Sequence, residues 1–358
     1  MSPSYPPEPI QDPGLIWPDA QRETDFNAWL AGLMPSHGLL APSLRSASAD
    51  ASFRRYFRID SREGSRIIMD APPAKEDCRP FAKVSRLMQE AGLHAPQVLA
   101  WDESKGFMLL TDLGPQTMMQ AMQRDDPWAN QATYLQAVDT LLTWQLASRP
   151  DVLPAYDAAL LRREMELFPD WYLARHRGIA VEAELRRTLD EAFDRIIQEN
   201  LRWPSVYVHR DFMPRNLMIS PNGLGVLDFQ DAVYGPITYD IASLMRDAFL
   251  SWEEDFVLDI TIRYWEKARK AGLPVGDDFG EFYRSVEWMG LQRHLRILGV
   301  FARLTLRDGK PRYLADAPRF IGYIRATAAR YRELKPLLRL VDKLEGIQEV
   351  SGFAYGRM

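Results

Sequence analysis

A short β-like segment interrupts a long helix-like sequence, and this interruption constrains the fold more than any other feature. Residues 205–230 contain two apolar runs, one with Val206 and Val208 and the other with Leu217 and Ile219. Apolar and β-branched residues that alternate over so few positions are typical of strands. The polar sequence HRDFMPRN (209–216) separates them. We therefore predict a loop held rigidly between two strands.

The sequence before this insertion reads as β-rich, and the sequence around it reads as helical. Strands are predicted at 52–60 and 65–70, joined by a turn at Glu63 and Gly64, and at 107–114, after a helix at 79–92. Amphipathic patterns then predict helices at 130–148, 157–175, 181–201, 238–249, 252–271, 279–306 and 317–345, with a break in the last left open. The predicted class is α+β, with a small β-rich lobe and a larger helical lobe.

The start of the chain differs from both lobes. Its first twenty residues carry six prolines and few large side chains, which predicts a disordered leader. Helical spacing of Phe26, Leu30 and Leu33 predicts that ordered structure begins near Glu23. The expected organisation is a leader at 1–20, an N-lobe at 21–114, and a C-lobe at 115–358 that carries the polar loop.

Composition excludes several classes of protein. The chain has 358 residues, 46% of them hydrophobic and 26% charged, and a net charge of -5, so nothing global points to nucleic acid. No apolar run approaches the roughly 20 residues of a membrane helix, and the N-terminus lacks a secretory pattern. We expect a cytoplasmic protein without membrane association. A single cysteine, Cys78, permits no internal disulfide and no Cys-rich metal site. The sequence does not indicate the oligomeric state.

Three polar residues of the insertion share one chemical explanation. Asp211 and Asn216 lie five positions apart, and Asp228 follows after LMISPNGLGVL, which reads as strand, Asn-Gly turn and strand. Such a hairpin brings Asp228 back beside Asn216. Amide and carboxylate oxygens are the hard ligands that Mg²⁺ accepts, with substrate phosphates completing its shell. Asp211 would then accept a proton from a nucleophile.

These motifs resemble a known family. HRDFMPRN is similar to the His-Arg-Asp-x-x-x-x-Asn catalytic loop of protein kinase-like folds, and LDFQD stands where those enzymes have Asp-Phe-Gly. Gln230 replaces the glycine, and no activation segment ending in Ala-Pro-Glu follows. These departures resemble the aminoglycoside phosphotransferase family, with its protein kinase-like two-lobe fold. DASFRRYFRI, MDAPPAKEDCRPF, LLTDLG and RDGKPRYLADAPR bring the resemblance closest to the bacterial anomeric N-acetylmuramate/N-acetylglucosamine kinases, from about residue 20 to the end.

The resemblance implies a role for each matching residue. Asp211 would be the catalytic base, and Asn216 and Asp228 would hold Mg²⁺. Asp240 would brace the catalytic loop through its backbone, with His209 as a further structural support. The implied activity is ATP-dependent phosphorylation of a small amino sugar at its C1 hydroxyl, in peptidoglycan recycling.

The nucleotide side is less regular than in protein kinases. The turn at 49–57 suits main-chain donors at Ser52 and Phe53 for the phosphates, and the backbone of Leu110 to Leu113, including Asp112, would form the adenine hinge. The lysine expected on the third strand is missing, and Met69 or Asp70 stands there. Four basic residues are candidate replacements, and the sequence does not choose among them: Lys75, Arg54, Arg55 and Lys83.

Candidates for the acceptor side come from the loop and from the helix predicted at 279–306. Arg215 would contact substrate or the γ-phosphate, or form a surface ion pair, and Asp231 would be an orienting group or a turn residue. Within the helix, one apolar stripe is predicted to face inward: Leu291, Leu295, Leu298 and Ala302. Arg293 on a flanking face would meet an anionic substrate group, and His294 would bind a sugar hydroxyl or be a core residue.

The segment 291–340 contains twelve Lys or Arg residues and three acids. Two interpretations stay open: solvated helix faces, or a local site for an anionic substrate group. Two rival functions also stay open. One is a kinase of another small hydroxyl compound, such as an aminoglycoside or an amino alcohol, and the other is a non-catalytic, nucleotide-binding pseudokinase.

Overall fold

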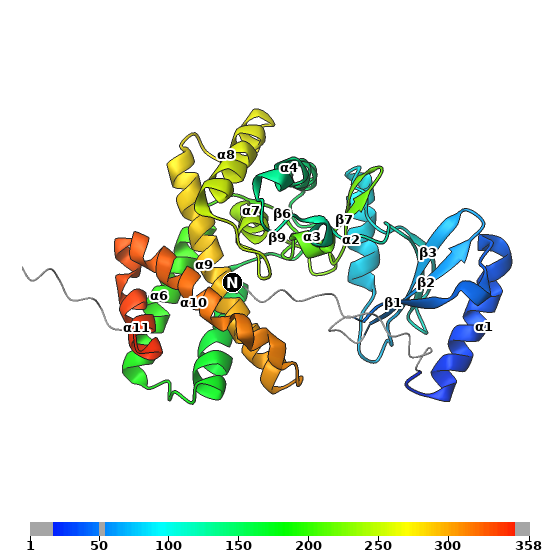
Figure 1. Cartoon of the computed structure of the whole chain (residues 1–358), viewed down its shortest axis with the longest axis horizontal. Helices are drawn as coiled ribbons and strands as arrows, with labels where there is room; N and C mark the ends of the chain where they lie inside the picture. Colours follow the sequence, from blue (N-terminus) through cyan, green and yellow to red (C-terminus); the bar gives the residue numbers. More distant parts are fainter. Residues whose placement is uncertain (1–16, 50–53, 348–358) are drawn as a thin grey trace, which may run out of the picture. The chain divides into compact units, whose positions relative to one another are not determined.

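The computed structural model describes residues 17–49 and 54–347. Contacts divide the chain into two compact units, one of Met1–Thr117 with Met218–Asp231 and the other of Met118–Leu217 with Ala232–Met358. Figure 1 shows the elements of each unit in sequence colours. Most of the predicted leader, and the phosphate-loop residues Ser52 and Phe53, lie outside the described residues.

The first unit is built on a five-stranded antiparallel sheet with the order β1-β2-β3-β5-β4. Its strands are β1 (Arg45–Ala49), β2 (Arg55–Ser61), β3 (Gly64–Asp70), β4 (Val98–Asp102) and β5 (Phe107–Thr111). The predicted turn between β2 and β3 is confirmed, because Ser61 pairs with Gly64. β1 and β4 were not predicted. The sequence of β1, RSASA, has no large apolar residue to reveal a strand.

One face of this sheet is covered by helix α1 (Ala20–His37), which begins slightly earlier than predicted. The carboxylate of Asp19 caps it by accepting a hydrogen bond from the N–H of Arg22 at 2.7 Å. Phe26 and Leu30 of α1 share a core cluster with residues of the sheet such as Ile68. A second helix, α2 (Arg79–Glu90), follows β3 as predicted.

The predicted strand, turn and strand after the polar loop are confirmed as β7 (Leu217–Ser220) and β8 (Gly223–Val226), which pair with each other. The N–H of Val226 donates to the carbonyl of His94 at 2.8 Å, and the N–H of Ile219 donates to that of Gln116 at 2.9 Å. These bonds group the hairpin with the first unit.

The second unit is mainly helical (Figure 1). Its longer helices are α4 (Gln131–Leu146), α5 (Ala158–Met165), the π-helix η3 (Phe168–His176), α6 (Ala183–Leu201), α7 (Thr238–Met245), α8 (Glu254–Lys270), α9 (Phe279–Leu306), α10 (Ala317–Arg330) and α11 (Lys335–Glu345). Short helices of one or two turns complete the two units: η1 (Ala41–Ser43), α3 (Met118–Ala121), η2 (Trp128–Asn130), η4 (Pro214–Asn216), η5 (Pro311–Asp316) and η6 (Arg332–Leu334). The helix predicted at 157–175 is divided into α5 and η3. Pro169 lies in η3, and a proline removes a helical hydrogen-bond donor.

The break left open within 317–345 occurs at Tyr331, whose backbone is extended. A pair of short strands, β6 (Ser205–Val208) and β9 (Val233–Pro236), also belongs to this unit. β9 was not predicted, because its sequence VYGP combines a glycine and a proline. Gly235 in β9 approaches Tyr156 so closely that an added Cβ would lie 2.5 Å from the Cβ of that tyrosine.

Helix α9 is the central element of the second unit and contacts η3, α7 and α10. The predicted inward stripe of α9 is confirmed, because Leu291, Leu295, Leu298 and Ala302 are buried. The flanking face that carries Arg293 is buried as well. Gln292 and Arg293 are 0% and 1% exposed, because neighbouring elements surround this part of the helix. Among the described residues, no helix combines the length and apolar character needed to cross a bilayer.

Candidate active site

The loop that follows β6 is held by hydrogen bonds to its main chain. The carboxylate of Asp240, in α7, accepts hydrogen bonds from the N–H groups of His209 (2.7 Å) and Arg210 (3.0 Å). Arg293 of α9 donates from Nη1 to the carbonyl oxygen of Arg210 at 2.7 Å. Arg210 has a φ of 76°, which is costly for a residue other than glycine. Because both of its main-chain groups are bonded, the surrounding protein stabilises this conformation.

The side chain of Arg210 points to a buried carboxylate, Glu164 of α5. Glu164 is 5% exposed and pairs with Arg210. Its carboxylate also accepts hydrogen bonds from the hydroxyl of Tyr156 and, at 3.0 Å, from Nε2 of Gln292. Nε of Arg296 lies 3.6 Å away. Burial alone would raise the pKa of Glu164, but Arg296 and Arg210 hold it below its ordinary value. An ionised carboxylate therefore links α5, the loop and α9.

Asp211 lies in the same loop, and its side chain is 29% exposed. Its main-chain N–H donates to Nδ1 of His209 at 3.3 Å, and its carbonyl accepts a hydrogen bond from Nδ2 of Asn216 at 2.9 Å. Nη1 of Arg296 lies 4.0 Å from Oδ1 of Asp211. The backbone of Asp211 is thus anchored on both sides while its carboxylate remains accessible to solvent.

Arginines determine the charge of Asp211. Burial would raise its pKa, but Arg296, Arg293 and Arg210, in this order, lower it below the ordinary value of an aspartate. The carboxylate is ionised at neutral pH, which is the state that a general base requires.

The two predicted metal ligands end the polar loop and the β7–β8 hairpin. Asn216, in η4, uses Nδ2 for the carbonyl of Asp211, so its amide oxygen is the atom that a cation would bind. Asp228 is exposed, has a φ of 62° and accepts a hydrogen bond from Nε2 of Gln230 at 2.9 Å. A carboxylate and an amide oxygen fit the chemistry of Mg²⁺.

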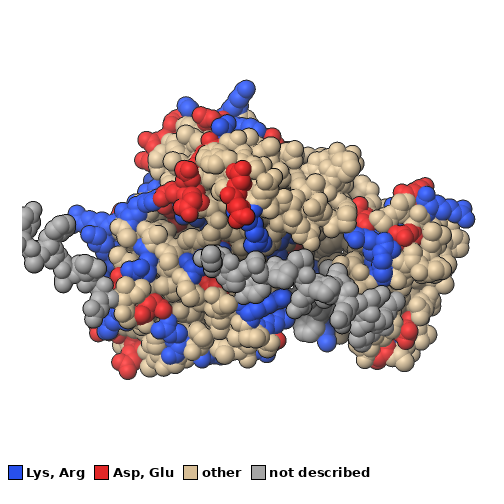
Figure 2. Space-filling model, viewed as in Figure 1, with Lys and Arg blue, Asp and Glu red and all other residues tan. Residues whose placement is uncertain are grey.

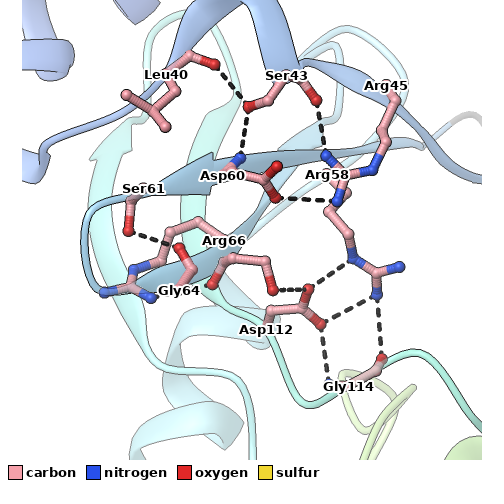
Figure 3. A network of polar contacts seen from close by, with 11 residues as sticks. Leu40, Ser43, Arg45, Arg58, Asp60, Ser61, Gly64, Arg66, Asp112 and Gly114 are labelled. Carbon is pink, nitrogen blue, oxygen red and sulfur yellow. Dashed lines mark hydrogen bonds and ion pairs between the residues drawn. The ribbon is translucent and has the colours of Figure 1, made fainter.

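The predicted adenine hinge, residues 110–113, consists of the last two residues of β5 and the two that follow it. Its residue Asp112 uses its carboxylate within the protein, with Arg58 of β2 as an ion-pair partner at 2.6 Å (Figure 3). Oγ of Ser65 in β3 donates to the same carboxylate at 2.7 Å, and the N–H of Gly114 donates to it at 3.0 Å. Burial would raise the pKa of Asp112, but the hydrogen bonds from Arg58, Ser65 and Gly114 hold it below its ordinary value. The Asp112 side chain therefore fastens the hinge to the sheet.

The place of the missing strand lysine is taken by two buried residues of β3. Asp70 is 0% exposed, accepts a hydrogen bond from Nε of Arg22 at 3.0 Å and pairs with Arg55. Asp70 and Ile68 share the face covered by α1, so alternation along the strand directs Met69 to the opposite face. Of the two residues that the sequence left open at this place, Met69 is therefore the one whose side chain points to the face of the sheet away from α1.

The four basic candidates for phosphate contact lie in different surroundings. Arg55 pairs with Asp70, and Arg54 lies 3.2 Å from Glu76. The remaining two are exposed: Lys75, in the segment after β3, and Lys83, in α2.

Comparison with known protein families accounts for most of the chain. The model described as "Phosphotransferase enzyme family" matches residues 43–278, more than half of the 358 residues. The chain belongs to this phosphotransferase family. The resemblance of its loop and hairpin motifs to aminoglycoside phosphotransferases is thereby confirmed.

Curated relatives cover nearly the whole of this phosphotransferase. An N-acetylmuramate/N-acetylglucosamine kinase of Neisseria meningitidis serogroup B is 47% identical over 338 residues, which are 94% of this chain and 100% of the relative. A protein of the same name from Pseudomonas aeruginosa is 47% identical over 333 residues, covering 91% of this chain and 98% of the relative.

Solved structures share the fold of this phosphotransferase at low sequence identity. A choline/ethanolamine kinase family protein from Mesorhizobium loti has a TM-score of 0.61 and 14% identity, and the match covers 90% of this chain and 99% of that one. An ADP-bound aminoglycoside phosphotransferase has a TM-score of 0.56 and 13% identity, covering 85% and 97%. These likenesses confirm the predicted α+β, protein kinase-like fold.

The predicted acceptor-side residues of this phosphotransferase are divided between the surface and the core. Arg215 and Asp231 are exposed, and the Arg215 guanidinium lies over the ring of Phe249 at 4.7 Å. Arg293 and His294 are each 1% exposed. Arg293 bonds the loop backbone, and His294 has the surroundings of a core residue, the alternative that the sequence left open.

His294 stacks on Tyr323 with 4.9 Å between ring centroids. Burial lowers its pKa well below the ordinary value of histidine, so the ring is neutral at pH 7. A neutral, enclosed imidazole packs as an aromatic residue.

Sequence reasoning missed three charged residues that organise the site: Glu164, Arg58 and Arg22. Glu164 lies in LLRREM, where consecutive charges look like a solvated helix face. Arg58 could have been noticed in the sequence, because it lies within a predicted strand. An arginine whose side chain is partly buried in a sheet needs a polar or charged partner.

Proposed function

We propose that this phosphotransferase is an ATP-dependent kinase that phosphorylates the anomeric C1 hydroxyl of N-acetylmuramate and N-acetylglucosamine in peptidoglycan recycling. The observation that carries the proposal is 47% identity to the Neisseria protein of that name over 94% of this chain and 100% of the relative. The anchored, ionised Asp211 adds chemical support, because the proposed reaction needs a proton acceptor.

The proposed reaction is an in-line transfer. Asp211 accepts the proton of the C1 hydroxyl as its oxygen forms a bond to the γ-phosphorus, while the bond from that phosphorus to the β,γ-bridging oxygen breaks and ADP leaves. An anomeric hydroxyl is more acidic than an ordinary sugar alcohol, so a carboxylate with a low pKa suffices. Asn216 and Asp228 would hold Mg²⁺, which neutralises phosphate charge when bound. Arg215, exposed in the same loop, would contact the sugar or the γ-phosphate.

A coupled ADP-release assay across amino sugars, aminoglycosides and amino alcohols tests the acceptor class. We expect turnover with the two amino sugars, and phosphorus NMR should identify a sugar 1-phosphate. A 6-phosphate product would contradict the C1 assignment. Turnover only with an aminoglycoside or an amino alcohol would contradict the proposed substrate class and identify another one. Absence of turnover despite ATP binding would favour a pseudokinase.

Substitution of the base tests the mechanism. Asp211→Asn should retain ATP affinity but lose kcat by roughly two to four orders of magnitude, the usual contribution of a general base. Asp170→Asn, an exposed aspartate of η3, is the matched control and should leave kcat unchanged. Near-normal turnover by Asp211→Asn would refute the assignment of the base.

A further inference from the structure

We propose that Arg58, Ser65 and Asp112 form a clamp that positions the adenine-binding hinge and so contributes to the affinity and base selectivity for ATP. The inference rests on the proposed function in one respect, the use of ATP, and takes residues 110–113 as the hinge predicted from the sequence. It assigns to Asp112 a positioning role in place of direct contact with the nucleotide.

The Asp112 carboxylate accepts hydrogen bonds from four donor atoms (Figure 3). Arg58 donates from Nε to Oδ2 at 2.6 Å and from Nη2 to Oδ1 at 3.1 Å. Ser65 donates from Oγ to Oδ2 at 2.7 Å, and the main-chain N–H of Gly114 donates to Oδ1 at 3.0 Å. A two-point contact between guanidinium and carboxylate is both strong and directional. The Asp112 side chain is only 5% exposed, so water competes weakly for these bonds.

The clamp restrains the second half of the hinge together with Gly114, the residue after it. Nη2 of Arg58 also donates to the carbonyl oxygen of Gly114 at 3.1 Å, so a single guanidinium bonds the first and last residues of 112–114. Gly114 has a φ of 111°, a conformation that favours glycine. The clamp therefore also holds this unusual backbone conformation, directly after the hinge.

Gln97, the residue directly before β4, provides a second restraint on the hinge. The N–H of Thr111 donates to the carbonyl of Gln97 at 3.1 Å, and the N–H of Gln97 donates to Oγ1 of Thr111 at 2.9 Å. Arg58 and Ser65 belong to β2 and β3. Contacts from both sides thus leave little freedom to the backbone that leads into the hinge.

The Asp112 side chain is fully hydrogen-bonded, but the main chain beside it is not. Within 17–49 and 54–347, the N–H and C=O groups of Asp112 and Leu113 form no hydrogen bond, although Leu113 is only 5% exposed. Asp112 is partly exposed as a residue although its side chain is only 5% exposed, so its accessible part is main chain, which a ligand can reach and pair. The edge of adenine offers one donor and one acceptor side by side. Because such bonds depend steeply on geometry, a hinge held by the clamp would bind adenine better than a mobile one.

Variants of the clamp in the full-length chain test this inference. Asp112→Asn and Arg58→Gln should each raise the KM for ATP on the order of tenfold, the effect of losing one charge-assisted hydrogen bond. Ser65→Ala should raise it about threefold, because a neutral hydrogen bond is weaker. The KM for GTP should change less, so the preference for ATP over GTP falls, while kcat and the KM for the sugar stay within about twofold.

Arg45→Gln is the matched control. Arg45 pairs with Asp60 at 3.0 Å on the same sheet, also drawn in Figure 3, but both side chains are exposed, 44% and 45%. This substitution removes an arginine from a neighbouring ion pair and should leave the KM for ATP unchanged. Melting temperatures of all variants separate stability from nucleotide recognition.

The outcomes distinguish this inference from the proposed function. Titration of the chain with ATP in the absence of sugar reports the clamp even if no sugar is phosphorylated. Unchanged ATP affinity and ATP-to-GTP preference in Asp112→Asn, with only a lower melting temperature, would overturn the clamp and leave the proposed function intact. If Asp112→Asn does not fold, the same measurements on Ser65→Ala and Arg58→Lys test the clamp. A normal preference for ATP over GTP in both variants would overturn it.

Discussion

At the scale of single residues, the chemistry of Asp211 is set by the cations around it. Its carboxylate lies near a guanidinium that also approaches Glu164, since Arg296 is 4.0 Å from Asp211 and 3.6 Å from Glu164. Arg296 also donates to the hydroxyl of Tyr239 at 3.1 Å. It therefore has a defined position, and its charge acts on both carboxylates.

Removal of this charge should change the pH dependence of catalysis. In Arg296→Gln the pKa of Asp211 should rise, because its largest source of stabilisation for the ionised form is lost. The proposed base would work as a carboxylate, so the acid limb of the kcat profile should move to higher pH, by about one unit. The measurement is kcat between about pH 3 and pH 7, a range that includes the ordinary pKa of an aspartate. Arg303→Gln, on the same helix, is the control, and an acid limb that does not move in Arg296→Gln would contradict the prediction.

At the scale of elements, the polar loop at 209–216 is held by three helices that are distant in sequence. Helix α5 contributes Glu164, α7 contributes Asp240, and α9 contributes Arg293. The loop needs these contacts because Arg210 has an unfavourable backbone conformation. The stability of the second unit and the geometry of the loop therefore depend on the same residues.

Replacement of Glu164 should be strongly destabilising. Glu164→Gln leaves Arg210 and Arg296 without their buried carboxylate, which should lower the free energy of unfolding by about 3–5 kcal/mol. Equilibrium urea unfolding measures it. Asp194→Asn is the control: Asp194 pairs with Arg162 but is 63% exposed, so its loss should cost no more than about 1 kcal/mol.

The pH dependence of this difference has a defined sign. The pKa of Glu164 is lower in the folded protein than its ordinary value, so its stabilising contribution is present above that value and is lost as the pH falls through the folded pKa. Wild type and Glu164→Gln should therefore approach each other in stability as the solution is acidified. A difference that stays constant down to the acid transition would argue against an ionised Glu164.

At the scale of the whole molecule, basic segments of the sequence are compensated by acids from elsewhere in the chain. Within the basic segment 291–340, Arg325 pairs with Asp342, and Arg330 pairs with Glu254 and Glu287. On the face drawn in Figure 2, Lys and Arg side chains are interspersed with Asp and Glu side chains. The excess of positive charge in this segment is therefore partly neutralised in the folded protein, which favours the interpretation as solvated, ion-paired helix faces.

Ligand binding offers a test of the proposed metal ligands across the whole molecule. A non-hydrolysable ATP analogue with Mg²⁺ should raise the melting temperature by roughly 5 °C at about a hundredfold excess over its Kd. Asn216→Ala and Asp228→Ala should reduce the Mg²⁺-dependent part of this increase. Asn222→Ala, in the exposed turn between β7 and β8, is the control. An unchanged Mg²⁺ dependence in both site variants would count against the metal role.

The sequence by itself determined the elements whose signals are local. The hairpins β2–β3 and β7–β8 were predictable because turn residues and alternating side chains lie within about ten positions of each other. Helix α9 was predicted at its observed bounds, since its apolar spacing continues over 28 residues. The catalytic-loop motif was equally visible, because the spacing of Asp211 and Asn216 is short and unbroken.

Only the tertiary structure decided which charged residues serve the site. Glu164 and Arg210 are 46 positions apart, and Arg58 and Asp112 are 54 apart, so no local pattern connects either pair. An arginine or glutamate in a helix has the same sequence signature whether it meets water or a buried partner. Burial and pairing depend on how separate elements pack, and this is why Arg293 belongs beneath the loop and Asp112 belongs to the clamp.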